Sequence, residues 1–260
     1  MLISSILFAT LLAGIGSVWL AAFLGYFALA RFNQHLLSLA AGALLSTAFM
    51  NLLPEAFEAA ATLNTEPHAL FTTLLVGLVF FFLLDKAELY HHGHEHHEHH
   101  AHGHHGHSHH EHDSAHGGSW AVLFGDSIHA FGDGVVIAAA FLANMQLGWA
   151  AALAVLAHEV PHHMGDLIVL GQNKRTALIK VTLAGTVTAI GGLAGYVLLA
   201  RLNGYLPYFL VVAGSSFIYV ALADLIPQLQ RRMSFTETLK QVAWLLAGMG
   251  LVMAVSQMSH

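Results

Sequence analysis

The chain has no cysteine and very few charged residues. Of its 260 residues, 9% are charged and 56% are hydrophobic, which is far from the average composition of soluble domains. The absence of cysteine excludes disulfides and thiolate metal sites. Nine lysines and arginines stand against 15 aspartates and glutamates, so no basic patch that would bind nucleic acid is expected. No stretch is suited to a soluble domain of useful size.

Long apolar runs dominate instead. A transmembrane helix needs about 20 predominantly apolar residues, and several uncharged runs reach or approach that length. The first run lacks a basic start and is too long for a signal peptide, so we interpret it as a retained helix. We predict an all-α integral membrane protein, a single transmembrane domain over residues 1–260. Its eight spans are expected near residues 2–30, 35–61, 67–90, 119–143, 147–170, 175–200, 205–230 and 238–258.

Lysine and arginine predict the orientation of these spans. Eight spans place both termini on one side of the membrane, and eight of the nine basic residues lie in loops or helix ends on the other side. Only Arg201 lies on the side of the termini. We therefore expect both termini outside the cell, the plasma (inner) membrane as the location, and the loop after the third span in the cytoplasm.

That loop is rich in histidine. The segment His91–His116 carries 15 of the 22 histidines, with glycine, glutamate and serine between them. Such a composition cannot build a core, so we expect residues 91–118 to be disordered without metal. Neutral imidazoles are good metal ligands at cytoplasmic pH. We interpret the loop as a metal buffer or sensor that is not essential for the main activity of the chain.

A faint internal repeat surrounds the middle of the chain. The second span ends in Asn51-Leu-Leu-Pro-Glu55 and the seventh in Asp224-Leu-Ile-Pro-Gln228. Each is the middle span of a triplet, and the two triplets enter the membrane from opposite faces. This pattern predicts inverted repeats in a 3+2+3 arrangement, with the fourth and fifth spans as the central pair. Asn51 and Asp224 are candidate pathway residues.

The central pair contains ionisable residues that need a common explanation. The fourth span reads Gly125-Asp-Ser-Ile-His-Ala-Phe-Gly-Asp-Gly134 and the fifth reads Ala157-His-Glu-Val-Pro-His-His-Met-Gly-Asp166. A charged side chain at the bilayer centre costs about 2.5–3.5 kcal/mol on insertion scales. A bound cation would explain why four acidic residues and four histidines gather in these two spans.

The spacing of these residues fits a metal site. Side chains four residues apart share one face of a helix, as His129 and Asp133 do, and His158 and His162 do likewise, with Glu159 beside them. Two antiparallel helices can thus present three imidazoles and two carboxylates to one point, a set that zinc accepts. We expect the glycines at 132, 134 and 165 to let the two backbones approach closely.

These paired motifs resemble a known family. The fourth-span pattern Gly-Asp-x-x-His-x-Phe-x-Asp-Gly, followed by His-Glu-x-Pro-His-x-x-Gly-Asp, is similar to the ZIP (Zrt/Irt-like) divalent metal transporters, and most to the branch with HExPHExGD in its fifth helix. The eight-span layout, the histidine-rich loop and the prolines of spans two and seven match as well. The resemblance implies uptake of zinc, or in variants of iron, manganese or cadmium, into the cytoplasm. It implies that the transport-site ligands are His129, Asp133, His158, Glu159 and His162.

Some positions depart from the family pattern. Ala130 stands where the family usually has an asparagine that binds a second metal, and His163 replaces the usual second glutamate. Asp126 and Asp166 lie toward the helix ends, where they either orient the ligands or bind metal directly. His163 is another candidate for orienting the ligands. No enzyme activity and no bound cofactor are expected, since the metal is the substrate.

Other interpretations of the same residues stay open. A polar network between helices would need no metal. His158-Glu-Val-Pro-His162 also matches the H-E-x-x-H motif of zinc metalloproteases, although Pro161 would kink the helix inside the motif. A cation-diffusion-type exporter would share the histidine and aspartate pairs, but such exporters usually have six spans and a soluble C-terminal domain. The pattern Gly191-x-x-x-Gly195 suits either a homodimer face or packing within the chain.

Overall fold

The computed structural model describes the backbone of residues 1–26, 33–63, 65–93, 115–169, 174–229 and 234–257. Side chains are described over the same ranges, except at 25–26, 33, 85, 87–93, 115–126, 165–166, 168–169, 174, 203 and 224–229. All regular structure in these ranges is helical. Most of the histidine-rich loop, residues 94–114, lies outside the described residues. Its predicted disorder therefore stays a prediction.

The described helices form the eight predicted segments, which confirms the all-α membrane class. The first two segments are interrupted by π-helical turns, whereas the other six are continuous α-helices. In chain order the elements are α1 (Leu2–Leu11), η1 (Leu12–Gly16) and α2 (Ser17–Tyr26); α3 (Asn33–Thr47), η3 (Ala48–Leu52) and α4 (Leu53–Thr62); α5 (Pro67–Gly93); α6 (Ala115–Ala143); α7 (Met145–Val169); α8 (Lys174–Arg201), followed by the short turn η4 (Asn203–Tyr205); α9 (Leu206–Leu229); and α10 (Phe235–Gln257). Residues 91–93 and 115–118, predicted as loop, are helical in α5 and α6.

The π-helical turn η3 lies just before a proline in the second span. Because Pro54 has no N–H, the carbonyl of Met50 loses its usual donor one turn ahead. The backbone N–H of Leu53 then donates to the carbonyl of Ala48, five residues back. Such π-bulges occur frequently at functional sites, and Asn51 lies in this one.

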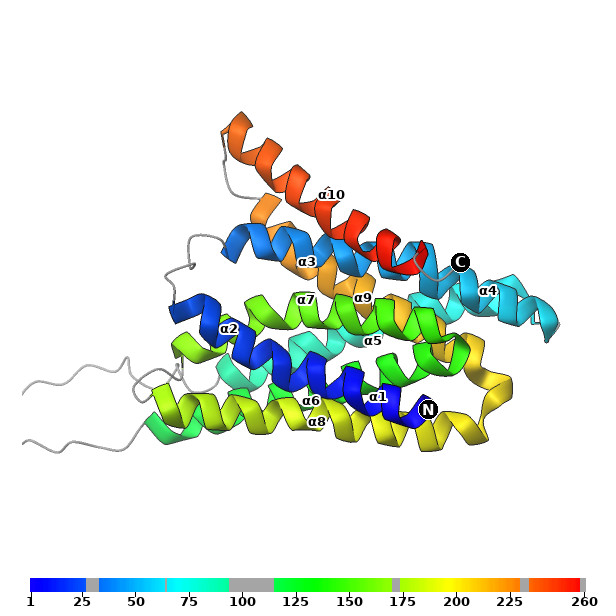
Figure 1. Ribbon diagram of the computed structural model, residues 1–260, viewed down its shortest axis with the longest axis horizontal. Helices are drawn as coiled ribbons and strands as arrows, with labels where there is room; N and C mark the ends of the chain where they lie inside the picture. Colours follow the sequence, from blue (N-terminus) through cyan, green and yellow to red (C-terminus); the bar gives the residue numbers. More distant parts are fainter. Residues whose placement is uncertain (27–32, 64, 94–114, 170–173, 230–233, 258–260) are drawn as a thin grey trace, which may run out of the picture.

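The packing of the helices agrees with an inverted repeat. Helix α3 packs along α10, and α5 packs along α9. Helix α7 packs against the first span, and α6 against α8. If spans one, two and three are exchanged with spans six, seven and eight, and span four with span five, the α3–α10 contact becomes the α9–α5 contact. The same exchange turns the contact between α7 and the first span into the contact between α6 and α8. The N-terminus and the C-terminal end of α10 lie at the same end of the bundle (Figure 1).

The helices differ in how much of their surface faces outward. Six described stretches are long and apolar enough to cross a membrane, but α7 is not among them and α6 contributes only the shorter apolar stretch Ser127–Ala143. The most apolar part of α5 and of α10 is only 11% buried, as expected of helices that face lipid. Helix α7 contacts the first span, α3, α6, α8 and α10. Protein surrounds α7 where lipid would otherwise lie, which explains why it tolerates polar residues.

Glycines bring α6 against α8 rather than against α7. A Cβ atom at Gly134 would collide with the carbonyl oxygen of Thr188, and one at Gly191 with the carbonyl oxygen of Phe131. The two backbones are therefore in direct contact, and the Gly191-x-x-x-Gly195 pattern packs within the chain. At Gly132 no atom lies within 4 Å of an added Cβ. The expectation that Gly132 and Gly134 join α6 to α7 is therefore wrong. The surroundings of Gly165 are not among the described parts of the structure, so its predicted role stays a prediction.

Candidate metal site

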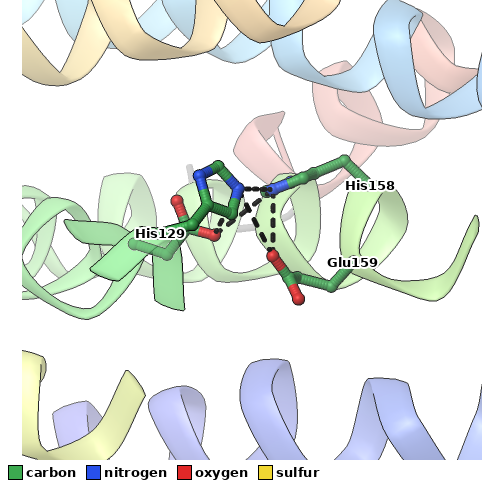
Figure 2. A group of neighbouring side chains, drawn as sticks. His129, His158 and Glu159 are labelled. Carbon is green, nitrogen blue, oxygen red and sulfur yellow. Dashed lines mark hydrogen bonds and ion pairs between the residues drawn. The ribbon is translucent and has the colours of Figure 1, made fainter. Parts of the chain in front are cut away.

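Two neighbouring helices contribute the side chains of the candidate site. His129 and Asp133 lie one turn apart on α6, and His158 and Glu159 are adjacent on α7. The imidazoles of His129 and His158 face one another, with the carboxylate of Glu159 alongside (Figure 2). One ligand atom from each of the four residues lies within 4.8 Å of every other. The α6–α7 cluster, as we call these four residues, is the only such group of metal-ligand side chains in the described part of the chain.

The distances within the α6–α7 cluster match those between the ligands of one zinc ion. The Nε2 atom of His158 lies 3.2 Å from Asp133 Oδ2, 3.3 Å from Glu159 Oε1 and 3.3 Å from His129 Nε2. The Nε2 atom of His129 lies 3.5 Å from Glu159 Oε1 and 3.7 Å from Asp133 Oδ2. A tetrahedral zinc with bonds of about 2.0–2.1 Å holds its ligand atoms about 3.3–3.4 Å apart. One ion can therefore contact all four atoms with small adjustments.

Two carboxylate oxygens of the cluster are buried close to the histidines but lack hydrogen bonds of normal geometry. Asp133, His158 and Glu159 are buried. Neither Asp133 Oδ2 nor Glu159 Oε1 takes part in a hydrogen bond of normal geometry within the described residues. A buried carboxylate oxygen without a donor is costly. A cation between these oxygens would supply the missing partner.

A backbone carbonyl on the far side of the ring from the cluster fixes the orientation of His158. Its Nδ1 lies 3.3 Å from the backbone carbonyl oxygen of Ala154, one turn earlier on α7. When Nδ1–H donates to this carbonyl, the tautomer is fixed and Nε2 presents its lone pair to the cluster. Backbone carbonyls commonly orient metal-binding histidines in this way.

His163 lies closer to the site than its sequence position suggests. It is 1% exposed, and its Nε2 is 2.9 Å from Glu159 Oε2, the carboxylate oxygen that does not face His129 and His158. His163 and Glu159 are four residues apart and so share a face of α7. The i, i+4 rule that pointed to His158 and His162 applied equally to this pair, and a search for it would have found the contact.

His162 stands at the edge of the cluster. Its side chain is exposed, and its ring centroid lies 5.9 Å from that of His129. It does not belong to the four residues whose ligand atoms converge, so its role as a ligand stays a prediction. The side chain of His129 is 29% exposed. The cluster is therefore closed on the side of Asp133 and His158 and more open on the side of His129 and His162.

The other predicted residues lie outside the cluster or cannot be placed. The Oδ1 atom of Asn51 accepts a hydrogen bond of 2.8 Å from Ser256 on α10. The Nδ2 atom of Asn51 is buried without a hydrogen-bond partner among the described residues. The side chains of Asp126, Asp166 and Asp224 lie outside the described residues, so their predicted roles stay predictions.

Comparison with known proteins identifies the family. A family model described as ZIP Zinc transporter matches residues 1–116 and 85–256. The chain belongs to the ZIP zinc transporter family. Among curated ZIP proteins, it is 32% identical over 142 residues to "Zinc transporter foi" of Drosophila melanogaster, covering 53% of this chain and 20% of that protein. It is 36% identical over 152 residues to "Zinc transporter ZIP10" of Mus musculus, covering 56% and 18%. It is 37% identical over 111 residues to "Zinc transporter ZIP4" of Homo sapiens, covering 42% and 17%.

Family membership decides between the interpretations of the H-E-x-x-H sequence. The relatives in this family are named zinc transporters, so family membership favours the transporter interpretation of the histidines and glutamate of α7 over the metalloprotease. The cation-diffusion-type exporter is excluded as the family for the same reason. The chain spans about a fifth of the length of these curated relatives.

Proposed function

We propose that this ZIP protein carries divalent transition metal ions, zinc foremost, across the membrane into the cytoplasm through the α6–α7 cluster. The observation that carries the proposal is the convergence of two imidazole nitrogens and two carboxylate oxygens at the ligand spacing of one zinc ion. Iron, manganese and cadmium accept the same nitrogen and oxygen donors, so they are the alternative substrates.

The charge of the cluster favours a divalent ion. Two carboxylates, those of Asp133 and Glu159, face the space where the ion would lie. A dication bound between them forms a site with no net charge, which reduces the large penalty of holding an isolated ion in a low-dielectric interior. The ion would exchange its hydration water for these ligands. Because protons compete with metals for imidazole and carboxylate, uptake should weaken at acidic pH.

The pattern of exposure supports a direction for the open side. On α7, His162 lies one turn beyond His158 toward the end of the bundle where α7 is followed by α8. On α6, His129 lies one turn before Asp133 toward the same end. One turn in the opposite direction, Ala154 and Ile137 are fully buried. The cluster is thus more accessible from the end at which α6 begins, which is the predicted cytoplasmic end.

The remaining predictions complete this proposal. His162 would contact the ion as it leaves the cluster, and Asp126 and Asp166 would orient ligands or bind the ion briefly. Asn51 and Asp224 would line the pathway. The histidine-rich loop of residues 91–118 would buffer metal in the cytoplasm. Both termini would lie outside the plasma (inner) membrane, and a homodimer is a compatible assembly.

Competitive uptake into proteoliposomes tests the proposal. Purified chain in lipid vesicles should accumulate radioactive zinc, and unlabelled zinc should compete more strongly than iron, manganese or cadmium. His158→Ala should remove most of the uptake, because His158 has the shortest contacts in the cluster. Vesicles without protein provide the background. Zinc uptake that stays at wild-type level in His158→Ala would refute the α6–α7 cluster as the transport site.

A further inference from the structure

The two oxygens of Glu159 have different surroundings. Its Oε1 atom faces the cluster, 3.3 Å from His158 Nε2 and 3.5 Å from His129 Nε2. Its Oε2 atom points away and lies 2.9 Å from Nε2 of His163. His163 and Glu159 are both almost fully buried, so water does not compete for this contact. One carboxylate is thus divided between the ion-binding space and a neighbouring imidazole.

This division limits how Glu159 can bind an ion. A carboxylate binds metal through one oxygen or through both. At 2.9 Å two lone pairs would repel one another, so Nε2 of His163 carries a hydrogen toward this carboxylate, although the contact lacks the geometry of a normal hydrogen bond. An Oε2 atom held in this way is not free to turn toward the cluster, so only Oε1 is presented. With one oxygen from Asp133 and two imidazoles, the number of ligand atoms stays at four.

We propose that His163 is a positioning residue that holds Glu159 to a single metal bond and thereby favours zinc over larger ions that require more oxygen ligands. Four ligands suit tetrahedral zinc, whereas manganese prefers six ligands rich in oxygen. Without the His163 contact, Glu159 can turn and offer both oxygens. This inference rests on the proposed transport function, because it concerns the selectivity of the same site.

Uptake of zinc and manganese by variants of the full chain in proteoliposomes tests this role. His163→Leu keeps a side chain of similar size but removes the donor. We expect it to raise the zinc KM by about 10–100-fold, the range for losing a group that orients a metal ligand, and to raise manganese uptake relative to zinc. His163→Gln retains an N–H that can reach Oε2 and should restore much of the zinc preference. Asparagine is too short to reach Oε2, so His163→Asn should behave like His163→Leu.

A matched control separates a positioning role from a structural one. His35→Leu removes an imidazole that stacks on Trp244, with ring centroids 5.9 Å apart, on α3 and α10. It should leave the zinc KM and the zinc-to-manganese ratio unchanged. If His163→Leu and His163→Asn lower the maximal rate for both metals equally, with KM values and the ratio unaltered, His163 has a structural role only and the proposal is wrong.

A chain that takes up no metal would count against the proposed function and not against His163. The selectivity is then measured as equilibrium competition between zinc and manganese in detergent, with His158→Ala defining the contribution of the histidine-rich loop. A wild-type zinc preference above that background, reduced in His163→Leu, supports the positioning role. An equal preference in wild type and His163→Leu overturns it.

Discussion

Exchanging Glu159 for glutamine tests the α6–α7 cluster with the smallest change in shape. In the wild type, Oε2 contacts His163 Nε2 at 2.9 Å and Oε1 lies 3.3 Å from His158 Nε2. Glutamine replaces one of these oxygens with an amide nitrogen. Because His163 offers a hydrogen, the amide oxygen should turn toward it. The amide hydrogens then point at the imidazole lone pairs, where a metal ion would have to lie.

The expected loss of metal affinity is large. Even losing a group that only orients a ligand costs about 10–100-fold in metal affinity. Glu159→Gln removes a ligand atom and one of the two carboxylates that balance a dication. We therefore expect zinc affinity to fall by at least about 100-fold, which corresponds to about 2.8 kcal/mol at 1.4 kcal/mol for each tenfold change. The change is conservative in volume, so helix packing should be preserved.

Isothermal titration with zinc measures this loss directly. Both wild type and Glu159→Gln should lack residues 94–112, so that the histidine-rich loop does not mask the site. Glu58→Gln, at an exposed position of α4, removes the same charge elsewhere and should retain wild-type affinity. Wild-type affinity in Glu159→Gln would refute the reasoning, because a ligand oxygen at the centre of the cluster cannot be lost without effect.

Three further predictions test the topology, the loop and the helix packing. Cysteines placed at Ser108 and at Ser259, in this chain without natural cysteine, should be labelled from opposite faces of the membrane; labelling from one face would contradict the orientation. Deleting residues 94–112 should lower the number of metals bound per chain and leave uptake measurable; loss of uptake in a correctly inserted chain would assign the loop an essential role. Gly134→Ala should destabilise the bundle by about 1–3 kcal/mol through overpacking, because its Cβ would collide with a backbone carbonyl. Gly132→Ala, with no atom within 4 Å of the added Cβ, should leave the thermal unfolding temperature unchanged or raise it.

The helices and the residues of the α6–α7 cluster were predictable because strong local signals specify them. Uncharged runs of bilayer length predict helices almost regardless of context, and the eight segments appear with boundaries close to those expected. His129, Asp133, His158 and Glu159 stood out because ionisable side chains in apolar spans are costly and need a common partner. Their convergence follows from i, i+4 spacing and from the antiparallel course of α6 and α7.

The faces of the helices were harder to predict. Spacing shows which residues share a face, but not which face is turned toward which neighbour. His162 and His163 are adjacent, yet His162 is exposed and His163 is buried against Glu159. Pro161 precedes both, and it removes the hydrogen bond that residue 161 would donate to the carbonyl of Ala157. The helix nevertheless continues through this turn, so spacing pairs His162 with His158 and His163 with Glu159 but does not show which pair is buried. Gly134 likewise faces α8 because the packing of the whole bundle, and not its neighbours in sequence, determines its partner.

The position of the cluster connects its chemistry with the architecture of the bundle. Two carboxylates at the bilayer centre would cost about 5–7 kcal/mol on insertion scales, comparable with the whole stability of many folded domains. Helix α7 lies among other helices, and α6 is joined to α8 backbone to backbone. Helices such as α5 and α10 instead expose most of their apolar surface, as expected of helices that face lipid. Polar residues can then be kept where a metal needs them, because the apolar surface that satisfies the membrane is supplied by different helices.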